Sequence, residues 1–187
     1  MGYVNILGID GDPNLGGEDF DNELMNFCIE EFRKEHLVDL RAQPGSSNIL
    51  RRLKVACEKQ KRFLSEAKKA KVSVDAVHGK LPISVLITRD IFNSLIEKYI
   101  MICLKIVDRV LAKVNPPGIH EVVLVGGSSR IPLVQEMLKK RFPQKVIIRK
   151  FNPDEAVARG AAILGSLIEE TSSSMTLIQE MGQMVLT

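Results

Sequence analysis

The chain has 187 residues, of which 45% are hydrophobic, so it is long and apolar enough to bury a substantial core. Its 26 Lys and Arg residues nearly balance its 23 Asp and Glu residues, and this small net charge of +3 argues against a nucleic-acid-binding protein. No signal-peptide pattern and no uncharged run of about 18 apolar residues occurs, so we expect no membrane partner.

The first half of the chain predicts a strand, two helices and a β-hairpin. Glycine and proline separate the strand from the first helix, and β-branched runs on both sides of His78-Gly79-Lys80 predict the hairpin of a small antiparallel sheet. In chain order these elements are a strand at 3–9, a helix capped by Asp19 or Asp21, a helix at about 48–69 capped by Ser46 or Ser47, and strands at 72–77 and 83–87.

The second half predicts a long helix followed by a βαβα pattern. Thr88 is the expected cap of the long helix, which ends before Asn115-Pro116-Pro117-Gly118 because proline cannot continue it. The later elements are a strand at 121–125, a turn at 126–129, a helix at 132–142, a strand at 146–149 and a helix at 154–168. This order implies a sheet with helices packed on it, followed by a tail or linker at 169–187.

Four polar side chains gather on one face of the second helix. At about 100° per residue, Glu58, Lys61, Arg62 and Ser65 fall within a sector of about 100°, beside the stripe that faces the core. Lys and Arg could hold a phosphate or stack on a purine, and Glu and Ser could bind ribose hydroxyls. A solvated face with Glu58 and Arg62 as an i,i+4 ion pair explains the same pattern.

A glycine turn at the end of the 121–125 strand is the second candidate site. Gly127, Ser128 and Arg130 follow the strand and precede a helix, where bare backbone amides can approach a ligand. A tight turn that needs glycine for its backbone angles is the alternative. The GxGxxG and GxxxxGK patterns are absent, so a dinucleotide-binding dehydrogenase is a weak third reading.

The third candidate segment runs from Asn152 to Ala162, and Asp154 is well placed in it as the N-cap of the last helix. Capping and close packing alone would explain this segment. The three histidines and the three cysteines, Cys28, Cys57 and Cys103, lack metal-ligand spacing. We therefore expect no metal site, no catalytic nucleophile and a reducing compartment.

Taken in order, these segments resemble the seventy-kilodalton heat shock protein (Hsp70) chaperone family. The resemblance covers about residues 3–168 and rests on five motifs. They are Gly11-Asp12 with Leu15-Gly16-Gly17-Glu18-Asp19-Phe20-Asp21-Asn22, Ala56-Cys57-Glu58 with Lys61-Arg62 and Leu64-Ser65, Ile87-Thr88-Arg89 with Phe92, Val122 to Pro132, and Asn152 to Ala162.

The resemblance implies an α/β fold, namely the second lobe of an actin-like (ribonuclease H-like) ATPase with an inserted α+β subdomain. It places an incomplete base at 1–17 and 97–168 and an upper subdomain at 18–96. The first two strands of such a lobe have no counterpart here, so we expect an exposed hydrophobic edge and a base less stable than the upper subdomain.

The resemblance also implies ATP or ADP as the ligand, with Mg²⁺ bound mainly by the lobe that has no counterpart here. Glu58, Lys61, Arg62 and Ser65 would contact ribose and adenine from one side, and Gly127, Ser128 and Arg130 from the other, with Asp154 nearby through water. The two arginines would enclose the purine. Hydrolysis by this chain alone is not expected, because phosphoryl transfer needs positioned charge and metal around the γ-phosphate.

By the same resemblance, the partners are nucleotide-exchange factors and J-domain co-chaperones in the cytoplasm. Unfolded clients would bind only through a domain that has no counterpart in this sequence. The alternative function is a non-catalytic interaction module that binds exchange factors or another chaperone lobe.

Overall fold

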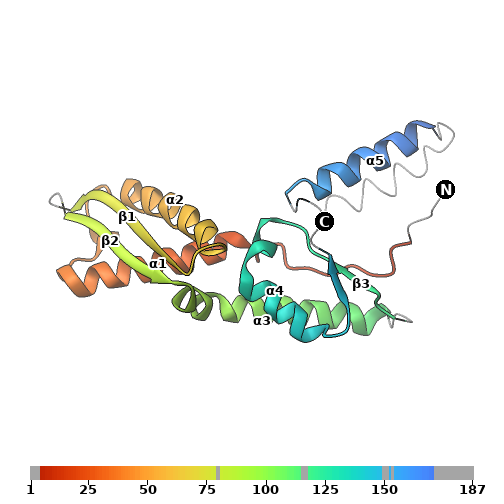
Figure 1. Cartoon of the computed structure of the whole chain (residues 1–187). Coiled ribbons are helices and arrows are strands. Elements are labelled where there is room, and N and C mark those ends of the chain that lie inside the picture. Colours follow the sequence, from red (N-terminus) through yellow and green to blue (C-terminus); the bar gives the residue numbers. More distant parts are fainter. Residues whose placement is uncertain (1–4, 79–80, 115–117, 149–151, 153, 171–187) are drawn as a thin grey trace.

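The fold has two parts joined by one long helix. A computed structural model describes residues 5–78, 81–114, 118–148, 152 and 154–170. Figure 1 shows α1, α2 and a β-hairpin at one end, β3, α4 and α5 at the other, and α3 running beneath both. The elements are α1 (Gly17–His36), η1 (Leu40–Ala42), α2 (Ser46–Leu64), β1 (Lys69–His78), β2 (Leu81–Thr88), α3 (Arg89–Val114), β3 (Glu121–Val123), η2 (Gly127–Arg130), α4 (Pro132–Arg141), β4 (Val146–Ile148) and α5 (Ala156–Glu170).

The predicted hairpin is confirmed. β1 and β2 pair antiparallel, with Lys69 opposite Thr88 and Val74 opposite Ile83. Side chains alternate across β1, so that Val72 and Val74 are buried while their neighbours Lys71 and Ser73 are exposed. This alternation turns one face of the hairpin toward α1 and α2, which pack on it and on each other.

The hydrophobic core lies almost entirely in the first part. Its buried members run from Phe20 on α1 to Ile100 on α3, and among the described residues Ile131 is the one buried member that the second part contributes. Phe92, Leu24 and Ile29 are among its largest fully buried side chains. The first part therefore contains the core on which α2 is held.

The second part has only a small sheet among its described residues. β3 and β4 pair in parallel over three residues each, from Glu121 opposite Val146 to Val123 opposite Ile148. Leu124 and Phe142 are buried, but Val123 and Val146 remain 49% and 60% exposed. These short strands therefore leave apolar side chains exposed to solvent.

The predicted strand at 3–9 is wrong for residues 5–9, which form neither strand nor helix, and residues 3 and 4 lie outside the described range. A strand exists only beside a partner, and none of the described strands pairs with this segment. Ile6 and Ile9 are exposed as a result. The segment is instead tied to α3 by Asp10, which pairs with Arg109 and Lys113, both at 3.0 Å.

Several helix ends also differ from the prediction. The cap of α1 is Gly16, and the Asp19 carboxylate accepts a hydrogen bond of 2.8 Å from its N–H. Gly45 caps α2 with a left-handed φ of 77°, which favours glycine, so Ser46 is already helical. α2 stops at Leu64 because the chain enters β1 five residues later.

The long helix begins as expected, because the Thr88 Oγ1 accepts a hydrogen bond of 3.2 Å from the N–H of Ile91. The βαβα order of the second half is confirmed, with β3 ending at Val123 and α5 beginning at Ala156. Within the described part of the chain, no helix combines the length and apolar character needed to cross a membrane. The tail beyond Glu170 lies outside the described residues.

Candidate functional site

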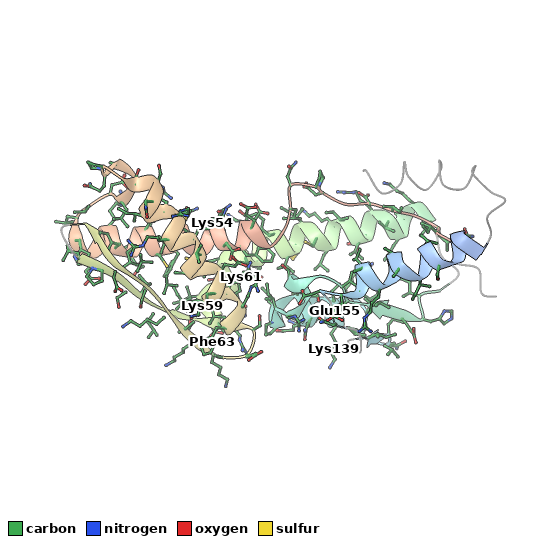
Figure 2. The ribbon with its side chains drawn as sticks, turned by 90° about the horizontal axis from the view of Figure 1, so that it is seen from above. Lys54, Lys59, Lys61, Phe63, Lys139 and Glu155 are labelled. Atoms are coloured by element: carbon green, nitrogen blue, oxygen red, sulfur yellow. The ribbon has the colours of Figure 1, made fainter. Side chains whose placement is uncertain are left out.

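A cleft of about 1000 Å³ lies where the two parts meet. Such a volume is at the upper end of the range of small-molecule sites. In Figure 2, Lys61 lies at the end of α2 that faces the part carrying Lys139 and Glu155. The walls of the cleft come from the end of α2, from η2 and the residues that flank it, and from the segment before α5. The lining residues are Lys61, Arg62, Ser65, Glu66, Leu124, Gly127, Ser128, Ser129, Arg130, Ile131, Gln135, Asn152 and Asp154.

The structure thus brings seven of the eight predicted site residues to one cleft, and Glu58 is the exception. Residues from α2 and residues beyond β3 are far apart in the sequence, so only the fold places them together. The sequence analysis missed Glu66 and Gln135, which line the same space but belong to no motif, and Asn152, which begins one of the five motifs but was given no role in the site.

Lys61 is held in the wall of the cleft by a buried ion pair. Its Nζ donates hydrogen bonds of 2.8 Å to the Asp21 carboxylate and to the Gly17 carbonyl. The side chains of Lys61 and Asp21 are only 12% and 9% exposed. Two of the three Lys61 donors are therefore used within the protein, and at most one remains for a ligand.

The burial of this ion pair is unfavourable for the charged form of Asp21. Burial raises the pKa of its carboxyl above the ordinary value, and the hydrogen bond from Lys61 only partly opposes that shift. Its Oδ1 atom is buried with no hydrogen-bond partner among the described residues. The sequence analysis considered Asp21 only as a possible helix cap and as part of the first motif, and it did not predict this ion pair.

Arg62 and Glu58 form the ion pair that the plainer alternative predicted, with 2.5 Å between Nη2 and Oε1. The Arg62 side chain is still 77% exposed and lines the cleft. Pairing does not remove Arg62 from the site, because a guanidinium bonded at its edge still offers its flat faces for stacking. Glu58 lies behind Arg62 and orients it.

Arg130 is held on the opposite wall in a similar way. Its Nη2 donates hydrogen bonds of 2.8 Å to the Asp154 carboxylate and 2.9 Å to the Asn152 side-chain oxygen. The predicted N-cap role of Asp154 is wrong, since α5 begins at Ala156 and the capping position belongs to the residue before it. Asp154 instead fixes the direction of Arg130.

The glycine turn between β3 and α4 needs its glycines for two different reasons. Gly126 has a φ of 80° and a ψ of 150°, a conformation that other residues rarely adopt. At Gly127, an added Cβ would lie 3.3 Å from the Asp154 Oδ1, so a larger residue would crowd the carboxylate that holds Arg130. With glycine at both positions, the backbone of the turn itself forms this part of the cleft wall.

Gly17 joins the two walls. A Cβ at Gly17 would lie 2.9 Å from the Ser128 Oγ on η2 and 3.2 Å from the Lys61 Nζ on α2. Only glycine allows α1, α2 and η2 to approach this closely. The two glycines at the start of α1 were visible in the sequence, but the contact partner on η2 was not.

The cleft therefore presents two tethered guanidinium groups, one on each wall, together with hydroxyl groups and open backbone. This combination suits a planar aromatic ligand that carries hydroxyl groups. Within the described ranges, no group of three or more His, Cys, Asp or Glu side chains is arranged so that it could hold a metal ion.

An α/β architecture with a cleft between a helix end and a glycine turn defines a ligand-binding module. Comparison with known proteins then assigns the family: the family model described as Hsp70 protein matches residues 1–181, and the chain belongs to the Hsp70 family.

Relatives in three organisms illustrate this membership. The chain is 40% identical to heat shock cognate 70 kDa protein 3 of Dictyostelium discoideum over 92% of its own length and 27% of the relative. It is 40% identical to a heat shock 70 kDa protein of Neurospora crassa, over 94% and 27%. It is 39% identical to a ribosome-associated molecular chaperone of Zygosaccharomyces rouxii, over 92% and 28%. The chain spans about a quarter of the length of these relatives.

Proposed function

We propose that this chain is the adenosine-nucleotide-binding lobe of an Hsp70-type chaperone ATPase, with ATP or ADP bound in the cleft. The observation that carries the proposal is that Arg62 and Arg130, from distant parts of the sequence, line one cleft beside Gly127 and Ser128. Family membership supports the nucleotide as the ligand, because the motifs of the resemblance are the ones that form this cleft.

In this proposal the purine lies between the two guanidinium groups. Each stacking contact would contribute about 1–2 kcal/mol when desolvated. Ser65 and the remaining Lys61 donor would face the ribose, while Glu58 and Asp154 would act by orienting the arginines through their ion pairs. This differs from the direct contact expected of Glu58, since Glu58 lies outside the cleft lining.

The proposal extends to the architecture. In this proposal, residues 1–17 and 97–168 form the base and residues 18–96 form the upper subdomain of an actin-like lobe that lacks its first two strands. Mg²⁺ and the groups that promote hydrolysis would come from the other lobe, so the chain would bind nucleotide without hydrolysing it at a useful rate. Exchange factors and J-domain co-chaperones in the cytoplasm would be its partners.

A titration of fluorescently labelled ADP tests the nucleotide assignment. Arg62→Ala and Arg130→Ala should each weaken binding about tenfold, which corresponds to about 1.4 kcal/mol. Arg51→Ala is the matched control, because Arg51 is an exposed arginine on the same helix that does not line the cleft. Unchanged affinity in both cleft variants would end the assignment.

A non-catalytic interaction module is the second candidate function. The observation in its favour is that α1, α2 and the hairpin share one continuous core, which could present a docking surface without any nucleotide. Capture of an exchange factor by a chain that shows no ADP binding would favour this function over the first.

A further inference from the structure

Arg89, the first residue of α3, belongs to the one sequence motif that the proposed site leaves unused. Its half-buried guanidinium bonds to the backbone at the end of α2 and just beyond it. Nε donates a hydrogen bond of 2.9 Å to the Leu64 carbonyl, and Nη2 donates bonds of 3.3 and 2.8 Å to the carbonyls of Ser65 and Ala67. The Arg89 backbone N–H donates a fourth bond, of 2.9 Å, to the Lys68 carbonyl.

These bonds cap the C-terminal end of α2. The last carbonyls of a helix have no partner inside it, so they need one from elsewhere. The carbonyls of Arg62 and Phe63 accept hydrogen bonds from N–H groups of the turn that follows, whereas those of Leu64 and Ser65 accept from Arg89. A cation at this end of a helix also opposes the negative end of its dipole. α3 therefore supplies a cap to α2 from 25 residues further along the chain.

The backbone that Arg89 holds also carries one wall of the cleft. Ser65 and Glu66 line the cleft, and Arg62 lines it from the last turn of α2. Arg89 itself is not among the lining residues, so it acts on a ligand only through the side chains that are. Hydrogen bonds that fix the backbone beneath a binding side chain also fix the direction in which that side chain faces. The cap is therefore placed to orient the α2 wall.

The same helix, α3, supports the opposite wall. Figure 1 shows α4 beside α3, and the two helices pack on each other. Arg141 on α4 pairs with Asp108 on α3 at 2.8 Å. Gln135, also on α4, donates a hydrogen bond of 2.9 Å from Nε2 to the Ser129 carbonyl in η2. Both walls of the cleft are therefore held in place relative to α3, the α2 wall through Arg89 and the η2 wall through α4.

We propose that Arg89 is a positioning residue for the ligand of the cleft. By capping α2 from α3, it sets the separation between the wall that carries Arg62 and the wall that carries Arg130. Lysine replaces it only in part, because an ammonium on a flexible stem does not match the fixed fork with which a guanidinium reaches several carbonyls. The inference rests on the proposed function, since it concerns the same cleft and the same nucleotide.

Titration of labelled ADP against the full chain with Arg89→Met or Arg89→Lys tests this role. Arg89→Met should weaken binding about tenfold, because the α2 wall is no longer held in the orientation that contacts the ligand. Arg89→Lys should weaken it only about threefold, because one cation restores part of the cap. Hydrogen exchange of a peptide covering 62–68 should rise in the same order, about tenfold in Arg89→Met and less in Arg89→Lys.

Leu40→Ala is the control for a general loss of stability. Leu40 is fully buried in η1, which precedes the opposite end of α2, so its truncation should destabilise the fold and leave ADP affinity unchanged once each sample is corrected for its folded fraction. If Arg89→Met does not fold, Arg89→Lys alone decides.

Unchanged ADP affinity in the Arg89 variants that fold would overturn the positioning role and leave the proposed function standing. An equal loss of affinity in Leu40→Ala would overturn it in the same way, by showing that any destabilised core weakens binding. Failure of the unmodified chain to bind ADP would instead overturn the proposed function, and this role with it.

Discussion

Gly17→Ala tests whether the close approach of the two cleft walls sets ligand affinity. The added methyl group would lie 2.9 Å from the Ser128 Oγ and 3.2 Å from the Lys61 Nζ. Carbon needs about 3.5 Å of separation for a favourable contact, so the Ser128 hydroxyl must turn away or η2 must retreat by about half an ångström. Under the proposed function, displacing η2, which carries Arg130, by that amount should weaken ADP binding about three- to tenfold.

The stability of α1 should not fall, because alanine is the better helix former by up to about 1 kcal/mol. Loss of affinity without loss of stability is therefore the expected signature. Labelled-ADP anisotropy measures the first quantity, and urea unfolding of the same samples measures the second.

Gly16→Ala is the control for this experiment. Gly16 has extended backbone angles and nothing within 4 Å of an added Cβ, so its replacement should leave affinity intact at a small capping cost. Ser128→Gly in the Gly17→Ala background should restore part of the binding. The reasoning fails if Gly17→Ala binds ADP like the unmodified chain, or if Gly16→Ala loses as much affinity.

Three further predictions concern stability. Arg89 donates hydrogen bonds to backbone carbonyls in the turn between α2 and β1, at 2.8 and 2.9 Å, so Arg89→Met should lower the free energy of unfolding in urea by about 2–3 kcal/mol while Arg51→Met changes little. The cations on α3 hold the pKa of Asp10 well below its ordinary value. The stability that Asp10 gives to the contact between segment 5–12 and α3 is therefore present above about pH 4 and is lost on further acidification. Hydrogen exchange of segment 5–12 should rise in that acidic range, and Asp10→Asn should show the same rise already at pH 7. Burial raises the pKa of Asp21, so the native state binds this proton more tightly than the unfolded state. The free energy of unfolding should therefore fall as the pH rises from about 4 through the raised pKa. Asp21→Asn should flatten this part of the plot of unfolding free energy against pH, and an unchanged slope would contradict the burial of the carboxylate.

The elements that local pattern controls could be predicted from the sequence. Alternating β-branched residues specified the hairpin, and the Thr88 cap with the following prolines bounded α3, because both signals act within a few residues. The site residues on α2 were predicted from their common helix face together with the family resemblance, since the spacing alone also fits a solvated face. The ion pair between Arg62 and Glu58 was also predicted, because the two residues lie one helical turn apart.

The features that depend on distant partners could not be predicted. The apolar run at 3–9 has the composition of a strand, but composition does not supply the neighbour that a strand requires. Asp19 and Asp154 are good capping residues by type, yet the positions of Gly16 and Ala156 decide which residue caps. The burial of Asp21 and the contact of Gly17 with η2 arise only when α1, α2 and η2 meet.

The two walls of the cleft differ in how firmly the rest of the protein holds them. The end of α2 is anchored in the core, whereas η2 follows a strand of three residues with exposed apolar neighbours. A ligand that bridges both walls must restrict the motion of the weaker one, and this conformational entropy subtracts from the observed affinity. Substitutions that rigidify β3 and β4 should therefore tighten binding without touching a single ligand contact.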